Sequence, residues 1–267
     1  MAYTQLWGTP SPGHIVYLVD LSGSMEDKVD YTIDTLNKVF YTLTVLCAKG
    51  NDVKERLTCS VIGYNDKAWV IWDDMSIRDI AQKVVNARQN KTPIFDKEKE
   101  FMPKGQTWMR LAFDEARKDI HKWIAKQKAA NKIMPAPIVI NITDGYPFEG
   151  GSTSWEKVSE ATLKAARDLM SISTPDGNVR VFNIHHDPTV SASMSLFPSI
   201  PPTDPAEKFL FDASSEMDSI TLSNAKLNFG ASEGSRYMVS NVKDSSILVK
   251  LVEWGSTKGD QKDGRYF

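Results

Sequence analysis

The sequence predicts an α/β fold in which helices cover both faces of a mostly parallel sheet. Short and nearly unbroken apolar runs occur at residues 14–19 (HIVYLV), 137–142 (PIVINI) and 179–184 (VRVFNI), as expected for strands that are buried on both sides. Between them lie longer segments whose apolar residues recur every three or four positions, which indicates amphipathic helices. Strands that alternate with long helices favour a three-layer arrangement around a parallel sheet.

The first predicted strand leads into a helix with one apolar stripe. The members of that stripe are spaced by three or four residues: Val29, Ile33, Leu36, Phe40, Leu43 and Cys47. Gly50 is the predicted end of this helix. Residues 57–64 and 68–72 are then strand-like, and the turn residues 65–67 (NDK) join them. We therefore expect an antiparallel hairpin, which places one antiparallel strand at an edge of the sheet.

Three segments follow the hairpin. Residues 77–87 indicate a short helix, and the charged residues 91–104 indicate a loop. A second long helix starts at Thr107, which is also a candidate cap for it. The residues on the buried face of this helix share helical spacing: Met109, Ala112, Phe113, Ala116, Ile120, Trp123 and Ile124.

The last third of the chain is less regular. Thr153 and Glu156 have the spacing of a capping box and stand at the start of a further helix. Residues 187–212 contain five prolines and several serines, so we expect a long loop with little regular structure. A last strand at 236–239 precedes a closing helix at 244–254, whose first residue is an aspartate and the predicted N-cap.

The length of the chain favours a single domain. The 267 residues, with a mass of 29.9 kDa, are enough to bury a sizeable core. The chain shows no change of composition typical of an interdomain linker and no internal repeat. We expect one domain at residues 14–255, an N-terminal arm at 1–13 and a C-terminal tail at 256–267.

Composition argues against several classes of function. The formal net charge is −2 and the pI is about 6.1, so no basic surplus indicates nucleic acid or a membrane surface as the partner. Cys47 and Cys59 are too few for a disulfide scaffold and lack zinc-site spacing. Residues 1–13 lack the features of a signal peptide, and no apolar stretch approaches the roughly 20 residues that span a bilayer. The sequence therefore predicts a cytoplasmic protein.

Oxygen-bearing side chains follow the predicted strands, at the sheet edge where ligands collect in open α/β folds. The set comprises Asp20, Ser22 and Ser24 after the first strand, Thr107 at the start of the second long helix, and Asp144 after the PIVINI strand. Two carboxylates and three hydroxyls, with no His or Cys, suit Mg²⁺ or Mn²⁺ rather than zinc or copper. Such a set leaves a coordination position open for an oxygen from another molecule.

These residues stand in three motifs, 20–25 (DLSGSM), 105–107 (GQT) and 142–145 (ITDG). In this order and on these elements, the motifs resemble the metal-ion-dependent adhesion site (MIDAS) of von Willebrand factor A (VWA) domains. The resemblance covers about residues 14–255. It implies the Rossmann-like fold of that family, with three layers and a mostly parallel central sheet.

The resemblance also implies a role for each predicted ligand. Ser22 and Ser24 would bind the ion directly, Thr107 would bind it in the closed state, and Asp20 and Asp144 would act mostly through water. The open coordination position would accept an Asp or Glu side chain from a partner protein. In this family ligation can shift the closing helix, so we expect that helix to relay occupancy of the site.

A narrower likeness is to compact cytoplasmic bacterial VWA proteins of the tellurium-resistance type. It rests on residues 182–185 (FNIH), 211–217 and 236–254. It implies a partner among the protein phosphatase and kinase modules of stress or conflict systems. The chain departs from the family at Gln106, where Gly-Gly-Thr is usual, and a side chain at this position affects the conformation of the loop.

Apolar residues lie beside the motifs in the sequence. Met25, Trp108, Tyr146 and Phe148 each stand close to a predicted ligand. Such residues belong either to the core or to the aromatic rim of a protein interface. We take the four as candidate partner contacts.

Three other interpretations fit part of this pattern. In a metal-dependent phosphatase of the haloacid-dehalogenase type Asp20 would be the nucleophile, but Ser22 stands where that chemistry needs a second acid. With no phosphate-cradling Gly-x-x-x-x-Gly-Lys-Ser/Thr run either, we predict a binding module and not an enzyme. A degenerate VWA domain would bind partners without metal. Residues 185–187 (HHD) suggest a second metal site, but adjacent strand residues point to opposite faces, so we expect structural roles for the histidines.

Overall fold

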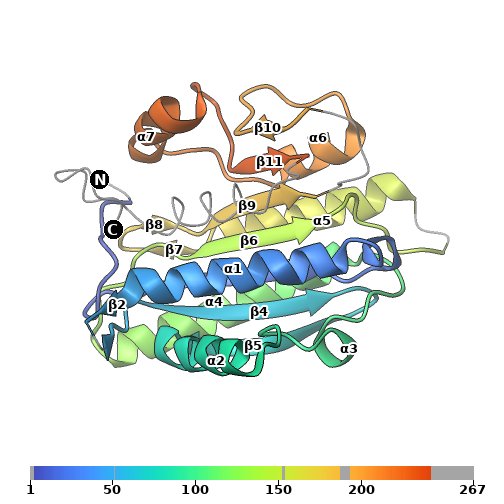
Figure 1. The fold of residues 1–267 in the computed structure, drawn as a ribbon. Coiled ribbons are helices and arrows are strands. Elements are labelled where there is room, and N and C mark those ends of the chain that lie inside the picture. The colour runs from blue at the N-terminus through green and yellow to red at the C-terminus, as the bar shows by residue number, and fades with distance from the viewer. Residues whose placement is uncertain (1–2, 51, 152–153, 187–192, 242–267) are drawn as a thin grey trace.

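The computed structural model describes residues 3–50, 52–151, 154–186 and 193–241, and its centre is a seven-stranded sheet (Figure 1). The strands lie in the order β10-β11-β9-β6-β1-β4-β5. Their bounds are Gly13–Asp20 (β1), Leu57–Tyr64 (β4), Ala68–Ser76 (β5), Ile138–Thr143 (β6), Arg180–His185 (β9), Ser195–Leu196 (β10) and Met238–Ser240 (β11). Helices cover both faces, which confirms the predicted three-layer α/β fold.

Pairing is parallel through the middle of the sheet. β1 lies between β4 and β6 and is parallel to both, and β9 is parallel to β6 and β11. β5 is antiparallel to β4, as the predicted hairpin requires. At the opposite edge the two-residue strand β10 is antiparallel to β11, so the sheet has a second antiparallel edge strand where the sequence predicts only one.

Two sets of helices cover the sheet (Figure 1). One face carries α1 (Val29–Cys47) and α2 (Ile77–Asn90), whose apolar residues join those of β1 and β4 in one buried cluster. The other face carries α4 (Met109–Ala129), α5 (Trp155–Met170) and α6 (Pro205–Asp212). Four of these five helices are predicted by the sequence, and only α6 is not.

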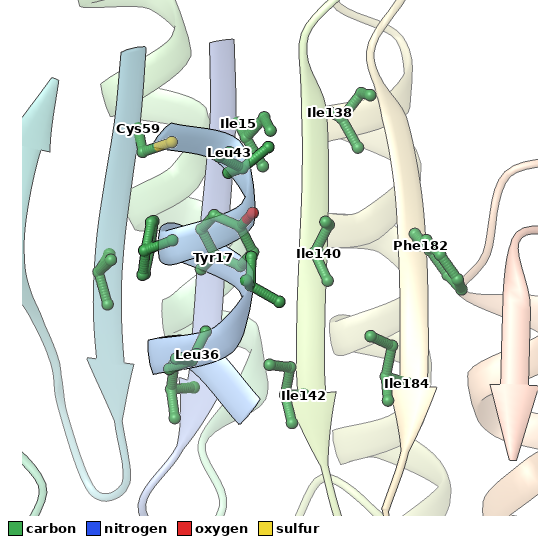
Figure 2. Close-up of a cluster of buried hydrophobic side chains, with 14 of the residues drawn as sticks. Ile15, Tyr17, Leu36, Leu43, Cys59, Ile138, Ile140, Ile142, Phe182 and Ile184 are labelled. Atoms are coloured by element: carbon green, nitrogen blue, oxygen red, sulfur yellow. The ribbon is translucent and has the colours of Figure 1, made fainter. Parts of the chain in front are cut away.

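Strand β1 contributes to the core on both of its faces. Ile15, Tyr17 and Val19 lie in the cluster beneath α1, whereas Val16 and Leu18 lie in the cluster beneath α4. Figure 2 shows part of the first cluster, with Ile15 and Tyr17 beside the helix that covers them. All five side chains are fully buried, so the strand is apolar from Ile15 to Val19 and Asp20 stands at its carboxyl end.

The predicted loop at 187–212 is partly wrong, because its described part contains β10 and α6. Asp204 caps α6 by accepting hydrogen bonds from the backbone N–H groups of Ala206 (2.9 Å) and Glu207 (3.0 Å). Pro205 occupies the first turn, where a missing N–H costs nothing. The Asp-Pro pair therefore marks a helix start within a segment whose other prolines suggest a loop.

Helix α7 (Ser219–Phe229) has no counterpart among the predicted elements. Asp218 caps the start of the helix by accepting hydrogen bonds of 3.0 Å from two backbone N–H groups. Gly230, with a φ of 71°, ends the helix. Of its residues only Ala225 is buried. The helix therefore lacks the apolar stripe from which the other helices are predicted.

The charged segment 91–104 is a loop with one short helix, α3 (Lys97–Glu100). Two phenylalanines, Phe95 and Phe101, are fully buried and pack with their ring centroids 4.8 Å apart. Charged side chains therefore face solvent while aromatic ones anchor the loop to the core.

Two short hairpins complete the described elements: β2 (Ala48–Lys49) with β3 (Asp52–Val53), and β7 (Ser173–Thr174) with β8 (Gly177–Asn178). The predicted closing helix at 244–254 and Thr153 of the predicted capping box lie outside the described residues. Within the described part of the chain, no helix has both the length and the apolar character needed to cross a membrane.

Candidate functional site

The predicted ligands gather at the edge of the sheet beyond the carboxyl ends of β1 and β6. These strands are parallel neighbours, so Asp20 at the end of β1 lies beside Thr143 at the end of β6. Four of the five predicted ligands line one pocket of about 510 Å³: Ser22, Ser24, Thr107 and Asp144. The fifth, Asp20, is fully buried. The topology thus brings together residues that are up to 124 positions apart in the chain.

Asp20 holds the turn that follows β1. Its Oδ1 accepts a hydrogen bond from the backbone N–H of Ser22 (2.9 Å), and its Oδ2 accepts one from the Thr143 hydroxyl (2.6 Å). The pKa of the Asp20 carboxyl is raised from 3.8 to about 6, mainly by burial and secondly by the Asp144 carboxylate. The hydrogen bonds from Thr143 and Ser22 lower the pKa in part. The fold therefore holds the Asp20 carboxyl in an environment that destabilises its ionised form.

Ser22, Ser24 and Asp144 form a chain of oxygen atoms. The two serine Oγ atoms lie 3.2 Å apart, and Ser24 Oγ donates a hydrogen bond to Asp144 Oδ1 over 3.0 Å. Oxygens on adjacent vertices of an octahedron with metal–oxygen bonds of about 2.1 Å lie about 3.0 Å apart. These two distances are compatible with ligands that share one Mg²⁺ or Mn²⁺ ion.

Thr107 completes the pocket from the loop that precedes α4. Its backbone exchanges two hydrogen bonds of 2.9 Å with Phe148, which ties this loop to the segment after β6. The prediction that Thr107 caps α4 is wrong, because the N-cap residue is Trp108, which makes no side-chain capping hydrogen bond. The bridge to Phe148 instead places Thr107 beside the pocket.

Gln106 fits this loop without disturbing it. Its Oε1 accepts a hydrogen bond from the indole N–H of Trp108 (2.9 Å), and its backbone N–H donates to Asp66 Oδ1 (2.7 Å). Gly105 has a φ of 71°, and a Cβ there would lie 2.3 Å from the Asp66 carboxylate, so a glycine is required. The Gly105 carbonyl accepts a hydrogen bond of 3.0 Å from the Gly23 N–H, which joins the loops that carry Ser22 and Thr107.

Lys28 is a residue of the site that the sequence analysis does not single out. Its ammonium lies 2.7 Å from Asp144 Oδ2 and donates to the Ser24 carbonyl over 3.2 Å. Both side chains of the ion pair are almost fully buried, at 9% and 7% exposure. The only signal in the sequence is a positive charge soon after the DLSGSM motif, and charge patterning alone does not place it in the pocket.

Two solved structures, with TM-scores of 0.50 and 0.52, support the fold. The manganese-loaded TRAP protein of Plasmodium vivax is 15% identical with a TM-score of 0.50, over 96% of this chain and 78% of that one. The pilus adhesin SpaC of Lactobacillus rhamnosus GG, in an open conformation, is 12% identical with a TM-score of 0.52, over 92% of this chain. A Catenulispora acidiphila protein described as von Willebrand factor type A matches at 14% identity and a TM-score of 0.41.

The chain has a VWA fold. It spans 33% of the Catenulispora protein and 30% of SpaC, and at these identities the likeness concerns the fold alone. The sequence matches no family model and no curated protein.

The predicted partner contacts of this VWA fold differ in exposure. Phe148 is 58% exposed at the pocket, and Tyr146 also lines the pocket. Trp155, which the sequence analysis did not include, is 45% exposed and packs edge to face on Tyr146 at 5.5 Å. Met25 is fully buried, so its selection as a partner contact is wrong and it belongs to the core. Trp108 is partly buried, and its indole N–H donates a hydrogen bond to Gln106.

His185, the last residue of β9, and His186, which follows it, have structural contacts. His185 Nε2 lies 3.1 Å from the backbone oxygen of Asp144, and the ring of His186 stacks on Tyr31 with centroids 4.2 Å apart. Among the described residues, no group of three or more His, Cys, Asp or Glu side chains is arranged to hold a metal ion. The candidate site is of another kind, because it combines two carboxylates with hydroxyl oxygens.

Proposed function

We propose that this chain is a protein-interaction module that binds Mg²⁺ or Mn²⁺ at the pocket and recruits a partner through an Asp or Glu side chain. The observation that carries the proposal is the convergence of Ser22, Ser24, Thr107 and Asp144 on one pocket, where Ser24 Oγ lies 3.2 Å from Ser22 Oγ and 3.0 Å from Asp144 Oδ1. Phe148 and Trp155 form an exposed aromatic rim beside the pocket, and this rim supports a protein as the partner.

Each residue would contribute differently to the ion. The hydroxyls of Ser22, Ser24 and Thr107 would offer neutral oxygen ligands, and Asp144 would supply charge at the pocket wall. Buried Asp20 would hold the Ser22 loop in place through its backbone hydrogen bond. When bound, the ion supplies a Lewis acid with an open coordination position, which a partner carboxylate can fill.

A phosphatase that uses Asp20 as its nucleophile is not favoured by the geometry. Asp20 has no exposed surface, and both of its carboxylate oxygens accept hydrogen bonds. A nucleophile must reach its substrate, so we propose that the protein is not an enzyme.

A metal-free interaction module is the second candidate, and one observation favours it. The Lys28 ammonium already neutralises Asp144 without any ion, over a distance of 2.7 Å. In that case the partner would bind the same face through the aromatic rim and its own polar groups.

We further propose that the partner belongs to a protein phosphatase or kinase module, as in the bacterial tellurium-resistance type. The support is the sequence likeness at 182–185, 211–217 and 236–254. Binding assays with purified modules of both classes, in Mg²⁺ and in chelator, test this. Metal-dependent binding supports the assignment, and its absence with every module contradicts it.

Thermal unfolding with increasing Mg²⁺ or Mn²⁺ separates the two candidate functions. A site-specific ion raises the unfolding midpoint, because it binds only the folded state, and Ser24→Ala removes the rise. The absence of any shift at millimolar metal contradicts the metal-dependent module. Selection of displayed peptides in Mg²⁺ or in chelator then tests recruitment, since peptides that require metal should share an Asp or Glu.

A further inference from the structure

The Lys28 side chain forms an ion pair with Asp144, which is also a predicted metal ligand. We propose that the Lys28 ammonium is a tethered cation that competes with the divalent ion for Asp144, so that metal binding requires its withdrawal. This inference rests on the proposed function, and it adds a device that sets the metal affinity of the site.

The contacts of Lys28 place its charge within the ligand set. The ammonium is 2.7 Å from Asp144 Oδ2, while Ser24 Oγ bonds the other oxygen, Oδ1, over 3.0 Å. It also donates to the backbone oxygen of Ser24 over 3.2 Å. One ammonium thus contacts two residues that the metal would use.

Electrostatic repulsion opposes the binding of both cations to this carboxylate at the same time. A divalent ion bound to Asp144, with the ammonium still 2.7 Å from the same group, would place two positive charges in one pocket. Because both partners of the ion pair are almost fully buried, water screens that repulsion poorly. Metal binding therefore favours a conformation in which the ammonium leaves Asp144.

The backbone of Lys28 can stay in place while its side chain moves. Lys28 is the N-cap residue of α1, and its carbonyl accepts hydrogen bonds from the backbone N–H (3.0 Å) and hydroxyl (3.2 Å) of Thr32. The four-carbon stem carries the charge on rotatable bonds, and Lys28 lines the same pocket as Ser22 and Asp144. Withdrawal of the ammonium thus needs no change in the helix.

The test compares Mg²⁺ affinity in two lysine variants by isothermal titration calorimetry. Lys28→Met removes the charge and keeps the length of the side chain, and we expect Mg²⁺ to bind about tenfold more tightly or better. Lys38→Met is the matched control, because Lys38 lies on the same helix and its ion pair with Asp34 is exposed. We expect the control to bind Mg²⁺ like the wild type.

The outcomes distinguish this inference from the proposed function. Metal binding by Lys28→Met with weak or no binding by the wild type supports both. Wild-type binding with equal or weaker affinity in Lys28→Met overturns the competition and leaves the function intact. If neither protein binds Mg²⁺, the metal-dependent function fails and the inference fails with it.

A measurement on the wild type keeps the inference testable if Lys28→Met does not fold. NMR detects the ammonium of a lysine when an ion pair slows its proton exchange. We expect a Lys28 ammonium signal in chelator that shifts or broadens as Mg²⁺ saturates the protein. A signal that is unchanged at saturation would show that the ammonium stays in place and would overturn the proposal.

Discussion

The ionisation of Asp20 affects the stability of the whole protein. The fold buries it completely, gives it two hydrogen bonds and places Asp144 nearby. The net result is a pKa of about 6 in place of 3.8. Between these two values the folded state binds a proton more tightly than the unfolded state does, so stability falls as the pH rises from about 4 to about 6. In the absence of metal, ionised Asp20 therefore destabilises the protein at neutral pH.

Asp20→Asn should accordingly stabilise the metal-free protein at pH 7.5. The gain is at most about 3 kcal/mol, from a pKa shift of about two units. It should vanish near pH 4, where the wild-type carboxyl is largely protonated. Urea unfolding in chelator at the two pH values measures it, and a variant that is less stable than wild type at pH 7.5 would contradict this prediction.

Thr107 offers a second test at the residue scale. Thr107→Val keeps the shape of the side chain and removes the hydroxyl, so we expect the increase in unfolding midpoint caused by Mg²⁺ to be largely lost. Thr107→Ser keeps the hydroxyl and should retain most of that increase. Equal metal stabilisation of both variants would show that the hydroxyl is not a ligand.

At the scale of elements, β1 connects two polar clusters at its opposite ends. Asp20 stands at the carboxyl end, and His14 stands near the amino end, about 20 Å away along an extended strand. His14 Nε2 lies 2.8 Å from Asp119 Oδ2, and Asp119 Oδ1 accepts a hydrogen bond from the Ser60 hydroxyl over 2.9 Å. All three residues are buried, so their hydrogen bonds link β1, β4 and α4 near the amino end of β1.

Asp119→Ala should therefore lower stability without affecting the metal site. It leaves His14 and Ser60 each without one buried partner, which costs about 2–5 kcal/mol in total. Urea unfolding measures the loss, and calorimetry should give a Mg²⁺ affinity equal to that of the wild type. A changed affinity would mean that the two ends of β1 are coupled.

Elements whose apolar pattern reflects burial could be predicted from the sequence. β1 and α4 are such elements, because β1 is apolar from Ile15 to Val19 and α4 carries a continuous apolar stripe. α6 and α7 could not be predicted in this way, since a proline-rich context hides the Asp204 cap and α7 buries only Ala225.

The candidate site shows the same division. The convergence of Ser22, Ser24 and Asp144 could be predicted, because their motifs follow the ends of β1 and β6, whose positions the topology determines. Lys28 could not be predicted, because its role depends on a contact with Asp144 across 116 residues of sequence. The burial of Met25 also depends on packing that the motif does not reveal.

At the scale of the whole molecule, the formal net charge is only −2, but charged side chains cluster at one place. Asp20, Asp144 and Lys28 gather at one edge of the sheet, and aromatic side chains stand beside them. A protein partner that approaches this face would meet the exposed rings of Phe148 and Trp155 beside a charged centre. With the proposed divalent ion bound, this centre would attract a partner carboxylate that is flanked by apolar residues.

Phe148→Ser should separate the aromatic contribution from that of the metal. We expect the affinity for metal-dependent peptides to fall about tenfold, because a 58% exposed aromatic ring at the rim is lost. Leu227→Ser, at an 86% exposed position on α7, is the control and should bind them normally. Fluorescence anisotropy with a labelled peptide measures both, and an equal affinity of the two variants would exclude Phe148 from the interface.

A crystal structure of the protein with Mn²⁺, with anomalous data, tests the central claim most directly. The account predicts one strong anomalous peak in the pocket, within bonding distance of Ser22 Oγ and Ser24 Oγ, and an ammonium of Lys28 that has moved away from Asp144. A structure at saturating Mn²⁺ with no peak in this pocket, and with the Lys28–Asp144 pair intact, would contradict it.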